Sequence, residues 1–175
     1  MNKEIAKLGL ILLIICGIST ALLAALNGVT EPIIKSNSEK IQEGYRSEVL
    51  PSAEVFEKIN EGVYIAKKGD TTVGYTINAA ENGYGGPVSI MVGINGDFTV
   101  SGVKILDQSE TAGLGAKCTD PEFLKQFEGK KSGMQIVKTT AGDTEIQAIS
   151  GATRTTRAVV GGVEDALKKA KEAAK

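Results

Sequence analysis

The sequence of 175 residues contains no histidine, no tryptophan and only two cysteines. Without histidine, the chain cannot form a Ser-His-Asp triad, a histidine-ligated zinc site or a CxxCH haem attachment. Cys16 and Cys118 lie about a hundred positions apart, so they form no CxxC motif and no disulfide framework. We therefore expect no metal site, and we expect Cys118 to be an inert thiol.

The sequence also lacks an excess of either positive or negative charge. The sequence has 20 basic and 21 acidic residues, which gives a net charge of -1 and no electrostatic reason to propose a nucleic-acid partner. Near the C-terminus, Lys168, Lys169 and Lys171 lie at helical spacing from acidic residues. This pattern favours a solvated helix face over a nucleic-acid or lipid patch.

One long uncharged run is present at the N-terminus, at residues 8–30. Its aliphatic core, residues 8–26, would span about 28 Å as a helix, which is close to the thickness of the hydrocarbon layer. We predict a short tail at residues 1–7 and a transmembrane helix at residues 8–30.

The run differs from a cleaved targeting signal. A secretory signal has a shorter apolar region and an A-x-A-like site, whereas Ala21, Ala24 and Ala25 do not form that pattern. A lipoprotein signal needs a small residue before the modified cysteine, and here Ile15 precedes Cys16. We therefore expect an uncleaved anchor.

Basic residues flank the run on both sides. Lys3 and Lys7 precede it, and Lys35, Lys40 and Arg46 follow it, so the positive-inside bias is close to nil. A short tail followed by a large polar domain favours a cytoplasmic N-terminus with the domain on the other side of the membrane.

Residues 31–60 are predicted to form a stalk and connecting helices. Ser36 and Ser38 can cap a stalk helix, which Pro51 would end. A second short helix is predicted at residues 56–59.

Residues 61–175 show the pattern of an antiparallel sheet with flanking helices. Two hairpins are predicted, one around a polar turn at residues 67–70 and one around Asn95-Gly96, a dipeptide that favours a two-residue turn. The remaining predicted elements are a helix at 121–127, strands at 135–137 and 145–149, and a last helix at 156–174. The expected fold class is α+β, with a single N-terminal transmembrane helix followed by a compact domain whose mainly antiparallel sheet is flanked by helices.

Small hydroxyl residues are densest at residues 150–156, just before the last predicted helix. The free N–H groups and the dipole of that helix, together with Arg154 and Arg157, would suit an anion such as a phosphate. The alternative is an ordinary helix cap, in which Thr155 or Thr156 accepts the first amide protons.

Three segments carry a family resemblance. Residues 147–153 (QAISGAT) resemble the flavinylation motif D-x-x-[ST]-G-A-[ST] of the FMN-binding domain family, with Gln147 in place of the acidic residue. Residues 109–115 (SETAGLG) resemble that family's E-T-P-G-L-G loop, with Ala112 in place of proline, and residues 83–87 (GYGGP) resemble its G-Y-x-G-P turn. In this order behind a single span, they are similar to the G subunits of Rnf-type ion-translocating ferredoxin:NAD oxidoreductase complexes.

The resemblance implies covalently bound FMN. Thr153 would carry a phosphoester to FMN, and the residues around the phosphate would be Ser150, Gly151 and Ala152. Those near the isoalloxazine ring would be Glu110, Thr111, Leu114, Gly115 and Tyr84. The alternative for Glu110 is a plain surface carboxylate.

The implied function is that of an electron-transfer subunit in a membrane complex that couples ferredoxin:NAD electron transfer to sodium or proton translocation. Its implied partners are the other membrane, iron–sulfur and flavin subunits and, during maturation, a flavin transferase. No catalytic residue is expected, and the chain is not expected to be catalytic alone. The alternatives are a C-type flavin subunit of a sodium-translocating NADH:quinone oxidoreductase, and a membrane-anchored scaffold without a cofactor.

Overall fold

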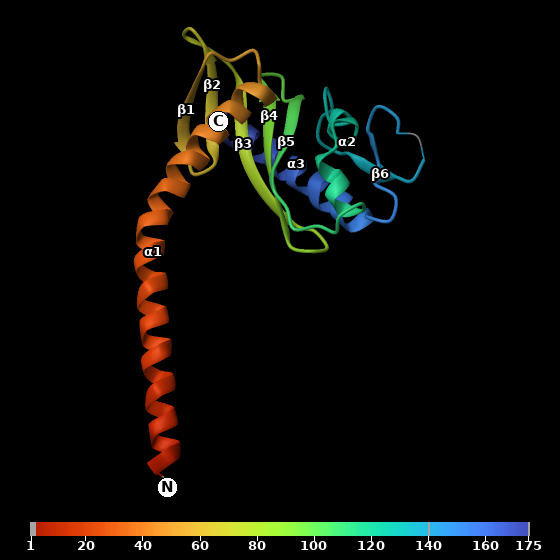
Figure 1. The fold of residues 1–175 in the computed structure, drawn as a ribbon. Coiled ribbons are helices and arrows are strands. Elements are labelled where there is room, and N and C mark those ends of the chain that lie inside the picture. The colour runs from red at the N-terminus through yellow and green to blue at the C-terminus, as the bar shows by residue number, and fades with distance from the viewer. Residues whose placement is uncertain (1–2, 140, 175) are drawn as a thin grey trace. The chain divides into compact units, whose positions relative to one another are not determined.

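The computed structural model describes residues 3–139 and 141–174. It divides into two compact units, Met1–Glu43 and Gly44–Lys175. In chain order the elements are α1 (Lys3–Val49), β1 (Val55–Asn60), β2 (Val63–Lys68), β3 (Thr71–Asn82), β4 (Pro87–Asn95), β5 (Val100–Asp107), the 3₁₀ helix η1 (Gly115–Thr119), α2 (Pro121–Lys125), β6 (Gln135–Val137), β7 (Glu145–Gln147) and α3 (Thr153–Ala173) (Figure 1).

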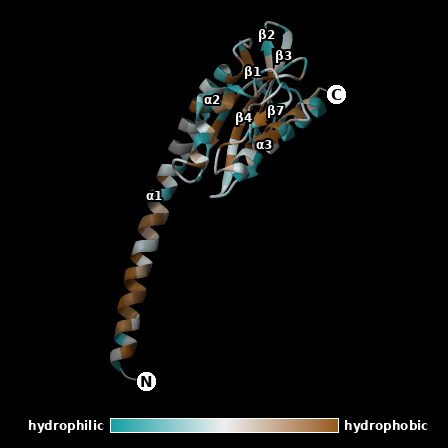
Figure 2. Cartoon of the chain, turned by 90° about the vertical axis from the view of Figure 1, so that its right-hand side faces the viewer, coloured by the Kyte–Doolittle hydropathy of each residue, from teal (hydrophilic) through white to brown (hydrophobic). Residues whose placement is uncertain are grey.

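Helix α1 contains the apolar run. Its stretch Lys7–Glu31 contains an 18-residue window with a mean hydropathy of 2.6 and is long and apolar enough to cross a membrane (Figure 2). The hydroxyl groups of Thr20 and Thr30 donate to backbone carbonyls one turn earlier, each at 2.8 Å. These polar groups are thus satisfied within the helix, as a hydrocarbon environment requires.

The predicted start of a separate stalk helix is wrong. Helix α1 runs without a break from Lys3 to Val49, so Ser36 and Ser38 lie inside it and cap no new helix. A residue in a helix interior caps nothing, because the preceding turn already supplies carbonyl acceptors. The predicted end before Pro51 is confirmed, and the amide of Leu50 makes the last bond of the helix, at 3.0 Å to the carbonyl of Arg46.

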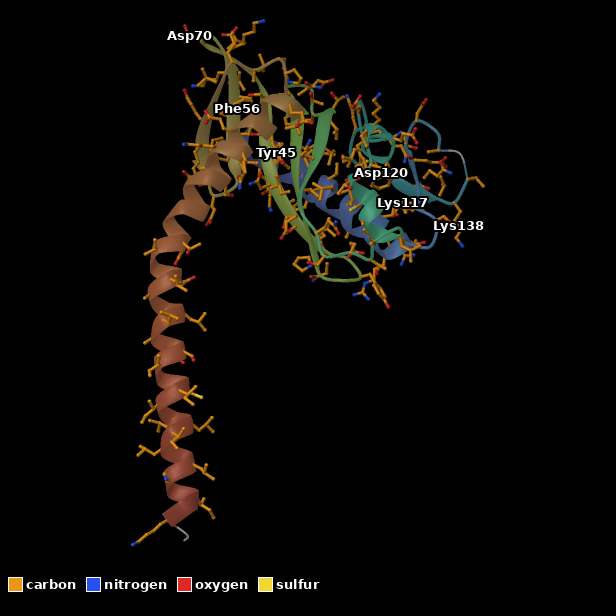
Figure 3. The ribbon with its side chains drawn as sticks, in the orientation of Figure 1. Tyr45, Phe56, Asp70, Lys117, Asp120 and Lys138 are labelled. Atoms are coloured by element: carbon orange, nitrogen blue, oxygen red, sulfur yellow. The ribbon has the colours of Figure 1, made fainter. Side chains whose placement is uncertain are left out.

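The centre of the second unit is an antiparallel sheet in the order β1-β2-β3-β4-β5. Both predicted hairpins are present, β2–β3 and β4–β5. Asp70 marks the tip of the first (Figure 3). The predicted antiparallel sheet is therefore confirmed.

The short helix predicted at residues 56–59 is wrong, because that segment is the edge strand β1. Its apolar residues Phe56 and Ile59 fit helical spacing, but the backbone pairs with β2, with Phe56 opposite Ala66. A salt bridge of 2.7 Å between Lys67 and Glu57 joins the two strands. Pairing with a neighbouring strand has overridden a weak local pattern.

The turn between β4 and β5 also differs from the predicted two-residue turn. Asn95 donates its amide to the carbonyl of Thr99 at 2.9 Å, which leaves three residues in the loop. Phe98 adopts the left-handed conformation, with φ of 61°, in place of Gly96. The side chain of Asp97 accepts bonds from both the amide and the hydroxyl of Thr99, and these bonds favour the longer loop.

Helix α3 covers one face of the sheet and packs on β3 and β4 (Figure 1). Ile77 of β3 and Val92 of β4 are paired in the sheet register, and both are fully buried on the face that α3 covers. A side chain at Gly162 would lie 2.8 Å from the Cδ1 atom of Ile90, so glycine lets the helix approach the sheet closely. This helix–sheet layer holds the main hydrophobic core.

The end of α1, from Gly44 on, covers the opposite face. The carbonyl of Val49 lies against the Cα atoms of Gly93 and Gly102, where any side chain would collide or crowd it. Arg46 is buried beside it, with its guanidinium 3.8 Å above the ring of Tyr64. The sheet is therefore a middle layer between two helical segments.

The C-terminal third supplies the remaining elements. The predicted helix at 121–127 is shorter, and the predicted strands form a separate parallel pair, β6 with β7. Helix α3 begins at Thr153, three residues before its predicted start. The apolar stripe of α3 is buried, whereas Lys168 and Lys171 are exposed, as predicted for a solvated face.

Candidate functional site

Three loops meet beside the N-terminus of α3. The first joins β3 to β4, where Gly83 donates its amide to the carbonyl of Gly86 at 2.8 Å and closes a tight turn. This turn leaves the side chain of Tyr84 74% exposed. The turn motif at residues 83–87 thus presents an aromatic ring at the surface.

The second loop follows β5. Its Glu110 amide donates to the side chain of Gln108 at 2.6 Å, and the amides of Leu114 and Ala116 both donate to the carbonyl of Thr111 at 3.1 Å. Gly113 has φ of 76°, a conformation that side chains disfavour. The loop is therefore folded on itself and runs directly into η1.

The third segment leads into α3. The helix is capped at Ala152, which provides no side-chain hydrogen bond. The hydroxyl of Thr156 accepts the amide of Ile149 at 3.0 Å and donates to the carbonyl of Ala152 at 3.1 Å. The alternative of an ordinary cap made by Thr155 or Thr156 does not hold, because both residues lie within the helix, after its N-cap at Ala152.

Glu110 joins all three segments. One carboxylate oxygen, Oε1, accepts the amides of Tyr84 at 2.8 Å and Gly85 at 2.9 Å. The other, Oε2, accepts a hydrogen bond from the hydroxyl of Thr155. A single carboxylate therefore links the β3–β4 turn, its own loop and the first turn of α3.

These contacts keep Glu110 ionised. Burial alone would raise the pKa of its carboxyl, but the hydrogen bonds from Thr155, Gly85 and Tyr84 and the positive charge of Arg154 together hold that pKa below its ordinary value.

Glycine is required where the loops meet this carboxylate. A side chain on Gly83 would collide with Oε1 of Glu110, and one on Gly115 would lie 2.5 Å from Oε2 and 2.7 Å from the Thr155 hydroxyl. A side chain on Gly85 would collide with the carbonyl of Ser109. Three glycines of the two upstream motifs, Gly83, Gly85 and Gly115, are thus explained by close packing at and beside Glu110.

A cavity of about 460 Å³ lies among these segments. It contains seven of the nine residues predicted for the cofactor and adds two, Arg154 and Thr155. Its lining residues are Tyr84, Glu110, Thr111, Leu114, Gly115, Gly151, Ala152, Arg154 and Thr155. The resemblance gave no role to Thr155, and only its position just after the hydroxyl-rich segment, in the first turn of α3, could have indicated one.

The other two predicted residues do not line this cavity. Thr153 is half-buried as the first residue of α3, between the lining residues Ala152 and Arg154. Ser150 is exposed and lines a cavity of about 630 Å³ on the side of η1 and α2, together with Lys117 and Asp120. The segment 150–153 therefore separates two cavities.

A further cavity, of about 520 Å³, lies between β5, α2 and the end of α1. It contains none of the predicted site residues. Volume alone does not identify a site, and the smaller cavity is the one where polar groups of the three segments converge.

No group of three or more metal-binding side chains occurs among residues 3–139 and 141–174. Cys118 is fully buried in η1. Burial, followed by the negative charges of Glu110 and Asp120, raises the pKa of its thiol to about 11. Its thiolate is therefore scarce at neutral pH.

Comparison with known families places two regions of the chain. Residues 83–168 match the FMN-binding domain, a range that contains all three loops of the site. Residues 1–49, which correspond to α1 and the short segment before it, match the RnfG N-terminal region.

Curated relatives match almost the whole chain. The G subunit of the Na⁺-translocating ferredoxin:NAD⁺ oxidoreductase complex of Acetobacterium woodii is 36% identical, over 92% of this chain and 89% of the relative. Its counterpart in the proton-translocating complex of Clostridium ljungdahlii is 35% identical, over 89% and 86%. The chain belongs to the RnfG family. The G subunit of the ion-translocating oxidoreductase complex of Escherichia coli K12 is 33% identical, over 95% of this chain and 91% of the relative.

Two solved structures share the fold of this RnfG domain. The C subunit of the Na⁺-translocating NADH-quinone reductase of Parabacteroides distasonis superposes with a TM-score of 0.51 at 28% identity, over 60% of this chain and 58% of that one. NqrC of Shewanella oneidensis superposes with a TM-score of 0.53 at 22% identity, over 67% and 64%. Sequence relatives over nearly the full length favour the RnfG family over this alternative.

The predicted family, the fold class and the presence of an FMN-binding domain are therefore confirmed. With its apolar helix, this RnfG protein is a membrane-anchored subunit of an oxidoreductase complex.

Proposed function

We propose that this chain is an electron-transfer subunit that holds FMN covalently through Thr153. It acts within a membrane complex that couples electron transfer between ferredoxin and NAD to the movement of sodium ions or protons. The relatives named as G subunits of such complexes support the assignment of the complex. The observation that carries the cofactor assignment is the meeting of three flavin-type motifs at one cavity.

The residues of the cavity fit a flavin mononucleotide. Its volume of about 460 Å³ lies within the usual range for small-molecule sites. Tyr84 and Leu114 supply apolar surface, whereas the uncapped N-terminus of α3 and Arg154 supply the hydrogen-bond donors and positive potential that a phosphate requires.

In this arrangement the first turn of α3 holds the phosphate. Thr153 provides the ester oxygen, and the backbone at Gly151 and Ala152 packs beside it, while the amide of Ala152 itself donates to the carbonyl of Ile149 at 2.9 Å. Ser150, on the far side of the same segment, covers the phosphate on the side that faces η1. Gly151, with φ of 76°, allows the close approach.

The ring end of the cavity is formed by the two upstream loops. Thr111 is placed to hydrogen-bond a ring edge, Leu114 and Gly115 to cover a face, and Tyr84 to shield the ring from solvent. When bound, FMN supplies the redox chemistry, and the protein positions it and adjusts its electrostatic surroundings. The chain needs no general acid or base and is not catalytic alone.

The proposed topology has a cytoplasmic N-terminus and the FMN domain on the other side of the membrane. A covalent link is useful there, because it keeps the flavin at an effective concentration of about millimolar even where free flavin is scarce. Attachment by a flavin transferase and contact with the iron–sulfur and flavin subunits complete the proposed set of partners.

The test replaces Thr153 in the full chain produced together with a flavin transferase. We expect Thr153→Ala to remain folded and membrane-bound without covalent flavin, while Thr153→Ser keeps an acceptor hydroxyl and retains it. In-gel flavin fluorescence after denaturation, and a mass gain of one FMN less one water in the peptide around residues 150–157, measure the link. Fluorescence of denatured Thr153→Ala would contradict the proposal.

The two alternatives give different results. Co-purification with the other components of a sodium-translocating NADH:quinone oxidoreductase would indicate the C-type assignment, which the fold likeness to that protein permits. A colourless wild-type chain with unmodified Thr153 would indicate a scaffold without a cofactor.

A further inference from the structure

The hydrogen bonds of Glu110 leave its carboxylate little capacity for a flavin. Oε1 accepts two backbone amides from the β3–β4 turn, and Oε2 accepts the hydroxyl of Thr155 and lies against Gly115. A carboxylate with both oxygens committed in this way is a structural link, although it lines the cavity.

Thr155 is the other end of this link. Its side chain is 1% exposed, and it lies two residues after Thr153 in the first turn of α3. Its hydroxyl is a donor to an ionised partner, and such bonds are stronger than those between neutral groups.

The first turn of α3 needs an external support. Ala152 gives it no side-chain cap, and uncapped first turns fray because their amides lack partners. The hydroxyl of Thr156 ties one side of the turn to Ile149 and Ala152. On the side of the cavity, the bond from Thr155 to Glu110 ties the turn to the two upstream loops.

We propose that Thr155 and Glu110 are a pair of positioning residues that fix the first turn of α3, and with it the hydroxyl of Thr153, against the walls of the flavin cavity. This inference rests on the proposed function, since the positioned group is the proposed flavin acceptor. Neither residue is assigned a covalent role or a contact with the reacting phosphate.

The test compares two substitutions of one side chain in the full chain. Thr155→Val replaces the hydroxyl by a methyl group of similar size, whereas Thr155→Ser keeps the hydroxyl and loses the methyl group. We expect Thr155→Val to slow covalent flavin attachment by roughly tenfold or more, in line with the loss of a hydrogen bond to a charged group. Thr155→Ser is expected to restore a rate near that of the wild type.

The matched control is Thr76→Val. Thr76 is 1% exposed, and its hydroxyl has no hydrogen-bond partner among the described residues. It lies on the sheet face opposite α3, so the same substitution there is expected to leave attachment unchanged.

A second measurement uses the chain before flavin is attached. Residue-resolved hydrogen exchange is expected to show the amide of Thr156, which donates to Ala152 at 3.0 Å, exchanging roughly tenfold faster in Thr155→Val. In Glu110→Ala the amides of Tyr84 and Gly85 are expected to accelerate by a similar factor, whereas Thr76→Val leaves all three unchanged.

The outcomes separate this inference from the proposed function. Loss of attachment in Thr155→Val with recovery in Thr155→Ser supports the pair. Equal attachment in Thr155→Val and wild type, or equal loss in the valine and serine variants, overturns the pair and leaves the proposed function intact. Should Thr155→Val fail to fold, Thr155→Ala takes its place: slow attachment in the alanine variant supports the pair, and attachment equal to that of the wild type overturns it. A wild-type chain that never acquires flavin overturns the proposed function itself, while the exchange measurement still tests the link.

Discussion

The Cα atom of Gly85 lies against the carbonyl oxygen of Ser109, and no side chain fits between them. Gly85 also donates its amide to Glu110, so the close approach and the hydrogen bond occur together. The two upstream loops are therefore in direct backbone contact at the edge of the cavity.

We expect Gly85→Ala to lower the free energy of unfolding by about 1–3 kcal/mol, because the added methyl group meets backbone that cannot easily move. The neighbouring Gly86→Ala is the control, since its methyl group would find its nearest neighbour, the Cβ atom of Ser109, at 3.8 Å. Gly86→Ala should change stability by less than about 0.5 kcal/mol. Urea unfolding of both variants, followed by far-UV circular dichroism, measures the difference, and equal stabilities would contradict the packing described.

Glu110 predicts a pH dependence of stability. Its folded-state pKa lies below its ordinary value of 4.5, so its stabilising contribution is fully present above that value and is lost as the pH falls through the folded-state pKa. Glu110→Gln cannot carry this charge, so its stability deficit relative to wild type should be constant near neutral pH and shrink below about pH 4.5. Urea unfolding at a series of pH values measures the deficit. A deficit that grows in acid would contradict this assignment.

Cys118 should be unreactive in the folded protein. Burial, with the charges of Glu110 and Asp120, raises the pKa of its thiol to about 11, and only the thiolate is nucleophilic. We expect iodoacetamide at pH 8 to leave Cys118 unmodified in the native chain and to alkylate it fully after unfolding in guanidinium chloride. Peptide mass spectrometry measures both states. Equal labelling in the two states would show that the thiol is accessible.

Much of the sheet is predictable from the sequence, because β2 to β5 show local alternation and polar turns. The strand β1 is not predictable in this way, since Phe56 and Ile59 fit a helical period, and its pairing with β2 across the turn after Asn60 decides the outcome. The loop after Asn95 shows the same limit on a smaller scale. The bonds from Thr99 to Asp97 outweigh the preference of Asn-Gly for a two-residue turn.

The motifs of the site are predictable as segments but not as contacts. They bring Tyr84, Glu110 and Gly151 to one cavity although 67 positions separate the first from the last. The sequence does not indicate that Glu110 bonds to Thr155, because that contact depends on how α3 packs against two loops. The attachment of FMN to Thr153 and the roles of the surrounding residues stay predictions.

The walls of the cavity include Thr155, in α3, which follows every other described element in the chain. A ribosome releases a polypeptide in order, and domains fold as their residues emerge. During synthesis, Oε2 of Glu110 therefore cannot accept the hydrogen bond from Thr155 until α3 has left the exit tunnel. The cavity is therefore among the last parts of the domain to form. Any enzyme that recognises the complete cavity must act after the domain has been synthesised.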